Sequence, residues 1–241
     1  MFHGHICIGE IVSEPIVVLR DVWKIYRDPK LGEVMALKGV NLIIKRGEIL
    51  AIHGPSGSGK TTLLKLIAGL ARPDRGDVIV DSYNLSMLDE EGLAMIRNTV
   101  VGYIPQDYGL VEDLTVYENV ELPLLLAGMP RRAREERVME ILKYIGLRDL
   151  ASKSVRFLSG GEKQRVAIAR AMVNTPSVIL ADEPTANLDW ENSIRALDML
   201  KSLNRDFRTT VVIVSHDPRV IDYADRAVII VNGVLKSYRE T

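Results

Sequence analysis

The sequence predicts an α/β fold built around a mostly parallel β-sheet. Short apolar, β-branched runs alternate along the chain with segments of helical periodicity. The runs at 49–53, 178–182 and 211–215 are apolar without polar alternation, which is typical of strands buried on both faces of a parallel sheet. From about 106 to 165 the strand pattern gives way to helical spacing, which indicates a helical segment inserted into the α/β core.

Strands and helices are expected in a definite order. The predicted strands span 16–19, 42–44, 49–53, 78–80, 101–104, 178–182, 211–215, 227–231 and 234–236. The predicted helices span 60–69, 116–128, 131–145, 160–174 and 188–204. Turns beside the early and late strands are expected at Gly39, Gly47, Gly76 and Gly233.

The composition is that of an ordinary globular protein. The 241 residues are 47% hydrophobic and 26% charged, and this length allows one large domain or two small ones. A net charge of -1 gives no global attraction to nucleic acid, which is not expected as a partner. Cys7 is the one cysteine, so an internal disulfide is excluded and a cytosolic setting is allowed. No apolar run approaches the roughly 18–20 residues that span a bilayer, so any membrane part must come from another chain.

A glycine-rich run follows the predicted strand at 49–53 and opens the next predicted helix. The run fits the phosphate-loop pattern G-x-x-x-x-G-K-[ST], in which backbone amides surround phosphates, a lysine adds a point charge and a hydroxyl binds Mg²⁺. A plain glycine turn between strand and helix is the alternative, and the position of the motif after a buried strand and at the start of a helix disfavours it. The expected nucleotide-binding residues are Gly54, Pro55, Ser56, Gly57, Ser58, Gly59, Lys60, Thr61 and Thr62.

The predicted strand at 178–182 ends in two carboxylates: Asp182 is its last residue and Glu183 comes next. Neighbouring residues of a strand point to opposite faces. Asp182 can therefore hold the Mg²⁺ shell while Glu183 faces an attacking water. Acids also end strands for structural reasons alone, and the phosphate loop upstream favours the catalytic interpretation.

A serine and two glycines open the predicted helix at 160–174. Ser159, Gly160 and Gly161 provide hydrogen-bond donors at the positively polarised end of a helix, which suits a phosphate. The alternative is structural, with Ser159 acting only as the N-cap.

The run 158–165, Leu-Ser-Gly-Gly-Glu-Lys-Gln-Arg, resembles the signature sequence of ATP-binding-cassette (ABC) ATPases. Together with the phosphate loop and the acid pair, the resemblance to the ABC cassette covers about 15–238. It implies a P-loop NTPase (RecA-like) core with a mostly parallel sheet, an N-terminal antiparallel β subdomain and an inserted helical subdomain. The implied single domain divides into an N-terminal extension at 1–14, an ATPase core at 15–105 and 166–241, and a helical subdomain at 106–165.

The resemblance also assigns roles to single residues. Tyr26, after the first predicted strand, would stack on adenine; a half-buried strand aromatic is the alternative. Gln106 would contact Mg²⁺ or the water, together with Thr61 and Asp182 as metal ligands. Glu183 would be the general base. His216, which as a lone residue could be purely structural, would meet the γ-phosphate.

The same resemblance implies an assembly. In this family two cassettes sandwich two ATP molecules head to tail, so ATP, Mg²⁺ and a second copy of the chain are expected. Across that seam Ser159, Gly160, Gly161 and Asp189 would contact the partner's nucleotide. A separate transmembrane permease subunit is implied, with this chain peripheral on the cytoplasmic face of the cell membrane.

The stretches 32–37, 109–124 and 130–132 resemble the branch of lipoprotein-release, macrolide-efflux and cell-division cassettes, which favours export or release. Pro105 and Ala186 depart from that branch's usual residues. A regulatory cassette that moves a membrane protein without transport is the alternative. A soluble cassette of translation or DNA repair is disfavoured, because the chain has one cassette and no sustained heptads.

Two further groups of residues have open interpretations. The leucines at 122, 124, 125 and 126 could line a groove for the membrane subunit or pack in the helix core. His3, His5 and Cys7 alternate, so a strand would place them on one face as a metal site; incidental residues of a terminal extension are the alternative.

Overall fold

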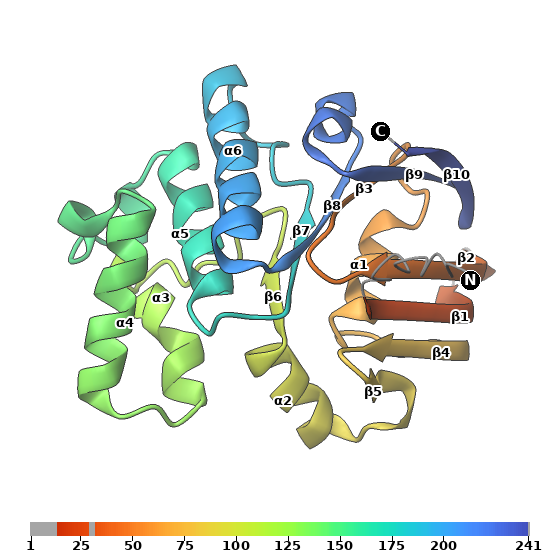
Figure 1. Cartoon of the computed structure of the whole chain (residues 1–241), viewed down its shortest axis with the longest axis horizontal. Helices are drawn as coiled ribbons and strands as arrows, with labels where there is room; N and C mark the ends of the chain where they lie inside the picture. The colour runs from red at the N-terminus through yellow and green to blue at the C-terminus, as the bar shows by residue number, and fades with distance from the viewer. Residues whose placement is uncertain (1–13, 29–31, 241) are drawn as a thin grey trace, which may run out of the picture.

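The computed structural model describes residues 14–28 and 32–240, and it contains two sheets with helices packed around them (Figure 1). The larger sheet has six strands in the order β10-β9-β3-β8-β7-β6, and all neighbours are parallel except β9 and β10. The smaller sheet is antiparallel, with the order β2-β1-β4-β5. The strands are β1 Pro15–Asp28, β2 Gly32–Lys45, β3 Ile49–His53, β4 Arg75–Val80, β5 Tyr83–Asn84, β6 Val101–Ile104, β7 Val178–Asp182, β8 Thr210–Ser215, β9 Arg226–Val231 and β10 Val234–Glu240.

Helices cover both faces of the larger sheet. In Figure 1 α1 lies between the two sheets, while α5 and α6 cover the opposite face and α3 and α4 lie beyond α5. The α-helices are α1 Lys60–Ile67, α2 Glu90–Thr99, α3 Val116–Leu126, α4 Arg131–Tyr144, α5 Gly160–Met172 and α6 Trp190–Phe207. Short 3₁₀ turns occur at Leu85–Met87, Arg148–Leu150, Val155–Phe157 and Pro218–Tyr223.

The central strands are buried on both faces, as their unbroken apolar runs predicted. In β3, Leu50 and Ile52 pack into a core shared with α1 and the antiparallel sheet, whereas Ile49 and Ala51 pack into the core beneath α5 and α6. This division follows from the two-residue period of a strand. The architecture is the expected α/β core with a mostly parallel sheet, an antiparallel β-sheet and added helices.

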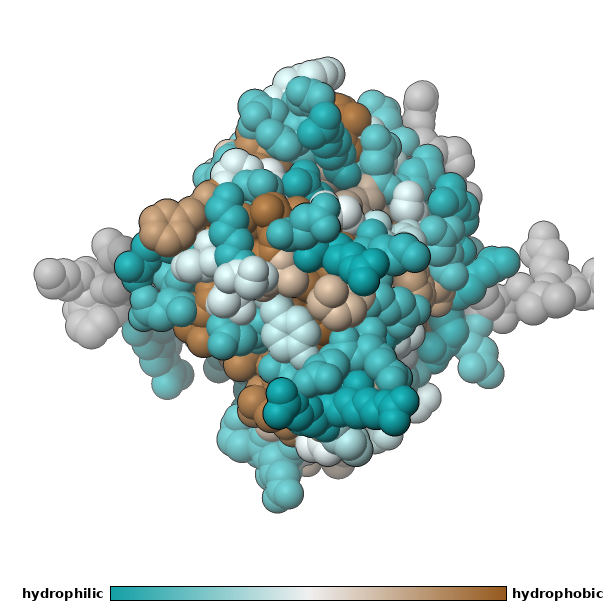
Figure 2. Space-filling model, turned by 90° about the vertical axis from the view of Figure 1, so that its left-hand side faces the viewer, coloured by the Kyte–Doolittle hydropathy of each residue, from teal (hydrophilic) through white to brown (hydrophobic). Residues whose placement is uncertain are grey.

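The helical end of the molecule, which includes α3 and α4, faces the viewer in Figure 2 and is predominantly hydrophilic. On α4 the charged residues form ion pairs one turn apart, including Arg131 with Glu135 and Arg132 with Glu136. Such exposed pairs contribute well below about 1 kcal/mol each. They keep this surface solvated without defining a binding site.

The turn predictions at Gly39 and Gly76 are wrong. Gly39 lies within β2 and Gly76 is the second residue of the six-residue strand β4, and at both places the register of β1 shifts against its partner strand. At Gly76, whose φ is +86°, a β-carbon would lie 2.3 Å from the carbonyl oxygen of Asp21. Only glycine fits such a backbone approach, so these glycines mark an irregularity within strands and not their ends. Gly47 and Gly233 do lie in turns.

The element predictions also missed α2 and β5 and made β1 and β2 too short. A signal for α2 was present in the sequence: Asp89 accepts a hydrogen bond from the amide of Gly92 as the N-cap, and Glu90 and Glu91 occupy the first turn. The long strands β1 and β2 bend at register shifts, which interrupts the alternation on which strand prediction depends.

Within the part of the chain that the structure describes, no helix is long and apolar enough to span a bilayer. The suggested cluster of His3, His5 and Cys7 lies outside the described residues.

Candidate functional site

The phosphate loop connects β3 to α1, as its sequence context predicted. At Gly54 a β-carbon would lie 2.3 Å from the carbonyl oxygen of Ile230, and at Gly59, with φ of +107°, it would lie 2.5 Å from that of Ala36. These approaches leave no room for a side chain. Gly59 is also the N-cap residue of α1, so the amides of the first turn are available to an anion.

Lys60 is buried at the base of this loop, with 6% of its surface exposed. Its Nζ donates hydrogen bonds to the carbonyl oxygens of Gly54, at 2.8 Å, and Pro55, at 3.1 Å. It also lies 3.4 Å from Oε1 of Glu183. The ammonium group is therefore held in the cradle by three oxygens, one of them anionic.

Asp182 ends β7 next to the start of α1 and is almost completely buried. Its Oδ1 accepts a hydrogen bond from the hydroxyl of Thr61 at 3.0 Å, and its Oδ2 accepts one from the hydroxyl of Tyr103 at 3.2 Å. Burial raises the pKa of Asp182, and these two hydrogen bonds oppose the rise. The pair of Thr61 and Asp182, which are far apart in the sequence, presents oxygen atoms side by side.

Glu183 does not continue the strand. Its φ of +48° is left-handed, so the expectation that strand alternation separates it from Asp182 is wrong. A turn directs it instead: Oε2 accepts hydrogen bonds from the hydroxyl of Ser215 at 2.9 Å and the amide of His216 at 3.1 Å. Nδ1 of His216 lies 2.8 Å from the same oxygen. Non-glycine residues in this conformation cost on the order of 1–3 kcal/mol and occur preferentially at functional sites.

These groups meet because β3, β8 and β7 are parallel neighbours. His53 pairs with Ser215 and Asp182 pairs with Val214, so the three strands end at the same edge. The phosphate loop, Glu183 and His216 each follow one of these strands directly (Figure 1). Ligands of open parallel sheets bind at this carboxyl edge.

A cavity of about 540 Å³ opens above the phosphate loop. Gln106 lies on its wall, and Tyr26, 42% exposed, lies at another side. Tyr26 is part of β1, paired with Val34, and does not follow the strand as expected. The cavity is lined by Tyr26, Val34, Met35, Ala36, Lys38, Ser56, Gly57, Gly59, Lys60, Thr61, Thr62, Gln106, Glu183, Asn232 and Gly233.

Ser159, Gly160, Gly161 and Asp189 do not line this cavity. Ser159 is the N-cap of α5 in a reciprocal capping box with Glu162, which is compatible with both interpretations of this serine. At Gly161 a β-carbon would lie 2.3 Å from the side-chain oxygen of Asn192, beside the start of α6. Asp189 caps α6 at its first turn. These residues therefore form a second surface, which is separate from the cavity in a single chain.

Sequence reasoning missed several residues that shape the site. Tyr103 and Ser215 hold Asp182 and Glu183, and Lys38, Asn232 and Gly233 line the cavity. A signal existed for Ser215, since it directly precedes His216. Lys38, by contrast, lies in β2, and its amide donates a hydrogen bond to the carbonyl oxygen of Gly233, which is distant in the sequence, so no local pattern indicates its place in the site.

Comparisons with known proteins agree with this geometry. The family model "ABC transporter" matches residues 37–186. The lipoprotein-releasing system ATP-binding protein LolD of Legionella pneumophila (strain Lens) is 41% identical over 93% of this chain and 98% of its own length. The methionine import ATP-binding protein MetN of Brucella abortus (strain 2308) is 40% identical over 92% of this chain and 59% of its own.

A solved structure is similar over nearly the whole chain. It is the dimeric post-hydrolysis state of the ATP-binding cassette MJ0796 bound to ADP and Pi, which is 40% identical, with a TM-score of 0.85 over 93% of this chain and all of that one. The resemblance inferred from 158–165 is thereby confirmed. The chain belongs to the ABC transporter family, as an ATP-binding subunit that hydrolyses ATP.

Proposed function

We propose that ATP binds in the cavity above the phosphate loop, with Glu183 as the general base of its hydrolysis. The observation that carries this proposal is the meeting of Lys60, Asp182, Glu183 and His216 at one edge of the sheet. Glu183 would take the proton of the attacking water. His216 Nδ1 fixes that carboxylate, and its partly exposed ring is free to meet the γ-phosphate.

Binding of ATP would change the partner of Lys60. The ammonium group now lies beside Glu183, and the β- and γ-phosphates offer it a stronger anionic partner. Glu183 would then be released for the water. Ser58 supports the phosphate position, because its buried Oγ has no hydrogen-bond partner among the described residues.

The residues fit a magnesium ion. Thr61 and Asp182 present hydroxyl and carboxylate oxygens 3.0 Å apart, and Gln106 adds a side-chain oxygen from the cavity wall. Oxygen donors of this kind, completed by phosphate, are what Mg²⁺ prefers. When bound, the ion would neutralise charge on the phosphates. Thr61, Gln106 and Asp182 would hold it.

Tyr26 provides a test of the nucleotide site. Replacement by alanine is expected to weaken ATP binding by about 5- to 160-fold, because base stacking on an aromatic ring is worth about 1–3 kcal/mol. Fluorescence titration with a nucleotide analogue measures the change. Tyr26→Phe, which keeps the ring, is the matched control and should bind as the parent does. Equal affinity of the alanine variant would contradict the assignment of Tyr26 to the base.

We further propose that the complete site needs a second copy of the chain. Ser159, Gly160, Gly161 and Asp189 lie on a surface outside the cavity, where a partner's nucleotide could reach them. The dimeric MJ0796 cassette supports this arrangement.

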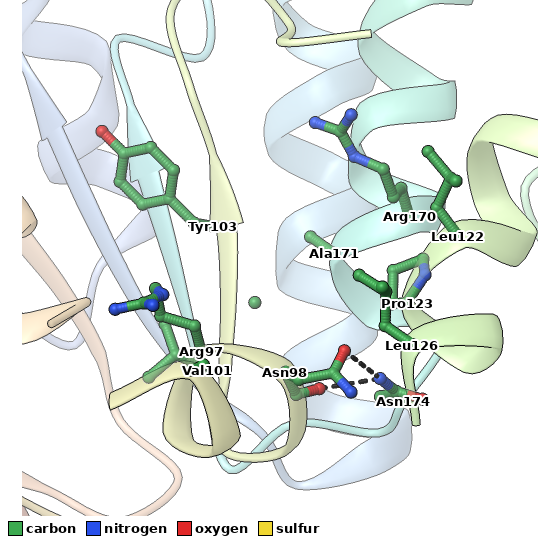
Figure 3. A pocket seen from close by; sticks show the side chains of 12 residues that line it. Arg97, Asn98, Val101, Tyr103, Leu122, Pro123, Leu126, Arg170, Ala171 and Asn174 are labelled. Carbon is green, nitrogen blue, oxygen red and sulfur yellow. Dashed lines mark hydrogen bonds between the residues drawn. The ribbon is translucent and has the colours of Figure 1, made fainter. Parts of the chain in front are cut away.

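A separate membrane subunit would bind in a groove of about 460 Å³ between α2, β6, α3 and α5, shown in Figure 3. Leu122 and Leu126 line it, and Leu126 is 78% exposed. Leu124 is fully buried in the core, and Leu125 is exposed outside the groove lining. Leu122 and Leu126 thus fit the groove interpretation, and Leu124 fits the core interpretation. Only part of the leucine run is available to a partner.

A charge in this groove tests the proposal. Leu126→Asp is expected to weaken the affinity of the chain for membranes of the source cells by about fivefold or more, measured by sedimentation with increasing amounts of membrane, since losing one buried apolar anchor costs more than about 1 kcal/mol. Met87→Asp is the control, because Met87 is 82% exposed and lies outside the groove. Equal sedimentation of both variants would argue against docking at this groove.

The position of the chain follows from this partner: it would be peripheral on the cytoplasmic face of the membrane. LolD relatives, whose name states lipoprotein release, support a role in release or export.

We also propose 15–105 and 166–241 as the ATPase core and 106–165 as a helical subdomain. The packing of α3 on both α4 and α5 supports that division, and α5 connects the two parts through β6.

A further inference from the structure

Tyr103 connects two parts of the molecule that the proposed function keeps separate. It lies on β6, opposite Leu180 in the parallel pairing with β7, and Asp182 is two residues further along β7. Two residues along a strand return to the same face, so the tyrosine and the aspartate are diagonal neighbours. This geometry lets the hydroxyl donate its 3.2 Å hydrogen bond to Oδ2 of Asp182.

The other side of Tyr103 faces the groove. In Figure 3 its ring stands on one wall, and its hydroxyl points away from Leu122 and Pro123 on the opposite wall. A phenylalanine could line the groove equally well. The hydroxyl therefore has a separate task, which is the bond to Asp182.

The two oxygens of Asp182 have different partners. Thr61 donates to Oδ1 and Tyr103 donates to Oδ2, and these are the side-chain donors that the structure gives this carboxylate within 14–28 and 32–240. Without Tyr103, Oδ2 would be a buried acceptor lacking a partner, and the carboxylate could turn about its Cβ–Cγ bond. Metal affinity commonly falls 10- to 100-fold when such an outer partner of a ligand is removed.

We propose that Tyr103 is a positioning residue that sets the orientation of the Asp182 carboxylate for Mg²⁺. The inference rests on the proposed metal role of Asp182. Thr61 fixes one oxygen from the phosphate loop, and Tyr103 fixes the other from β6. Metal affinity then depends on a strand that also forms the wall of the groove.

The test is Tyr103→Phe, which removes the hydroxyl and keeps the ring. Binding of a fluorescent ADP analogue is titrated at fixed free Mg²⁺ concentrations and in EDTA, and the thermal unfolding midpoint checks the fold. Mg²⁺ is expected to increase the affinity for the ADP analogue, and the Mg²⁺ midpoint is the concentration that gives half of this increase. In Tyr103→Phe the Mg²⁺ midpoint is expected to rise about 10-fold, while the affinity in EDTA stays unchanged. Tyr144→Phe is the matched control, since it removes a tyrosine–aspartate hydrogen bond, to Asp206, far from the site.

Four results would overturn the proposal. An unchanged Mg²⁺ midpoint would leave the hydroxyl without a role, and a lower midpoint would make it a competitor of the metal. An equal loss of affinity in EDTA would show a general structural effect. If instead the unmodified chain bound the ADP analogue equally well with Mg²⁺ and in EDTA, the metal role of Asp182 would fall and the positioning role with it.

Discussion

Replacement of Glu183 by glutamine is expected to slow ATP hydrolysis by about 10²- to 10⁴-fold while ATP still binds, because the amide cannot take a proton from water. Glutamine has the size and shape of glutamate, so its side chain can take the same place beside Ser215 and His216. Lys60 keeps the carbonyl oxygens of Gly54 and Pro55 and loses its anionic partner. The affinity for ATP should therefore stay equal or rise.

The measurement pairs phosphate release with nucleotide binding on the same preparation. Glu191→Gln is the control, because Glu191 is exposed on α6 and pairs with Arg195. It should hydrolyse ATP at the parent rate. Turnover near the parent rate in Glu183→Gln would remove Glu183 from the role of base, and loss of ATP binding would show that the carboxylate serves the cavity structure instead.

The proposed site residues were predictable because each lies at the carboxyl end of an apolar strand or in the loop that follows it. Lys60, Asp182 and His216 could be placed at one edge once the strands at 49–53, 178–182 and 211–215 were recognised as buried and parallel. Parallel neighbours end together, so a one-dimensional pattern was sufficient to bring distant residues into one site.

The residues that support them were not predictable in this way. Tyr103 reaches Asp182 along a diagonal between two strands, and its partner depends on the register of β6 and β7. Glu183 itself was expected in the site, but the left-handed turn that directs it was not, because no local residue preference favours that conformation. Gly39 and Gly76 were assigned to turns for a related reason: a glycine needed inside a strand, for its positive φ at Gly39 or for a close backbone approach at Gly76, looks the same in sequence as a glycine that ends a strand.

Ser159→Arg is expected to abolish hydrolysis while ATP binding to the single chain is retained. Ser159 lies outside the cavity lined by Lys60 and Gln106, so a bulky cation there leaves the cavity intact. In a head-to-tail dimer it would stand where the partner's γ-phosphate must fit. The site is thus predicted to be complete only across two chains.

Mixing two inactive variants separates a shared site from a site within one chain. Lys60→Ala disables the phosphate loop, and Ser159→Arg disables the signature surface. In a mixed dimer one site receives both defects and the other receives neither. A 1:1 mixture that exchanges subunits should therefore regain activity from about a quarter of its sites, since a symmetric dimer presents each surface twice.

The controls are each variant alone, which should remain inactive, and a mixture of Lys60→Ala with Glu183→Gln. Both of those substitutions act on the phosphate-loop side of the site, because Lys60 and Glu183 lie 3.4 Å apart in one chain. Every site of that mixed dimer carries one defect, so no activity should return. Activity in the control mixture, or none in the first, would contradict a division of the site between Ser159 of one copy and Lys60 of the other.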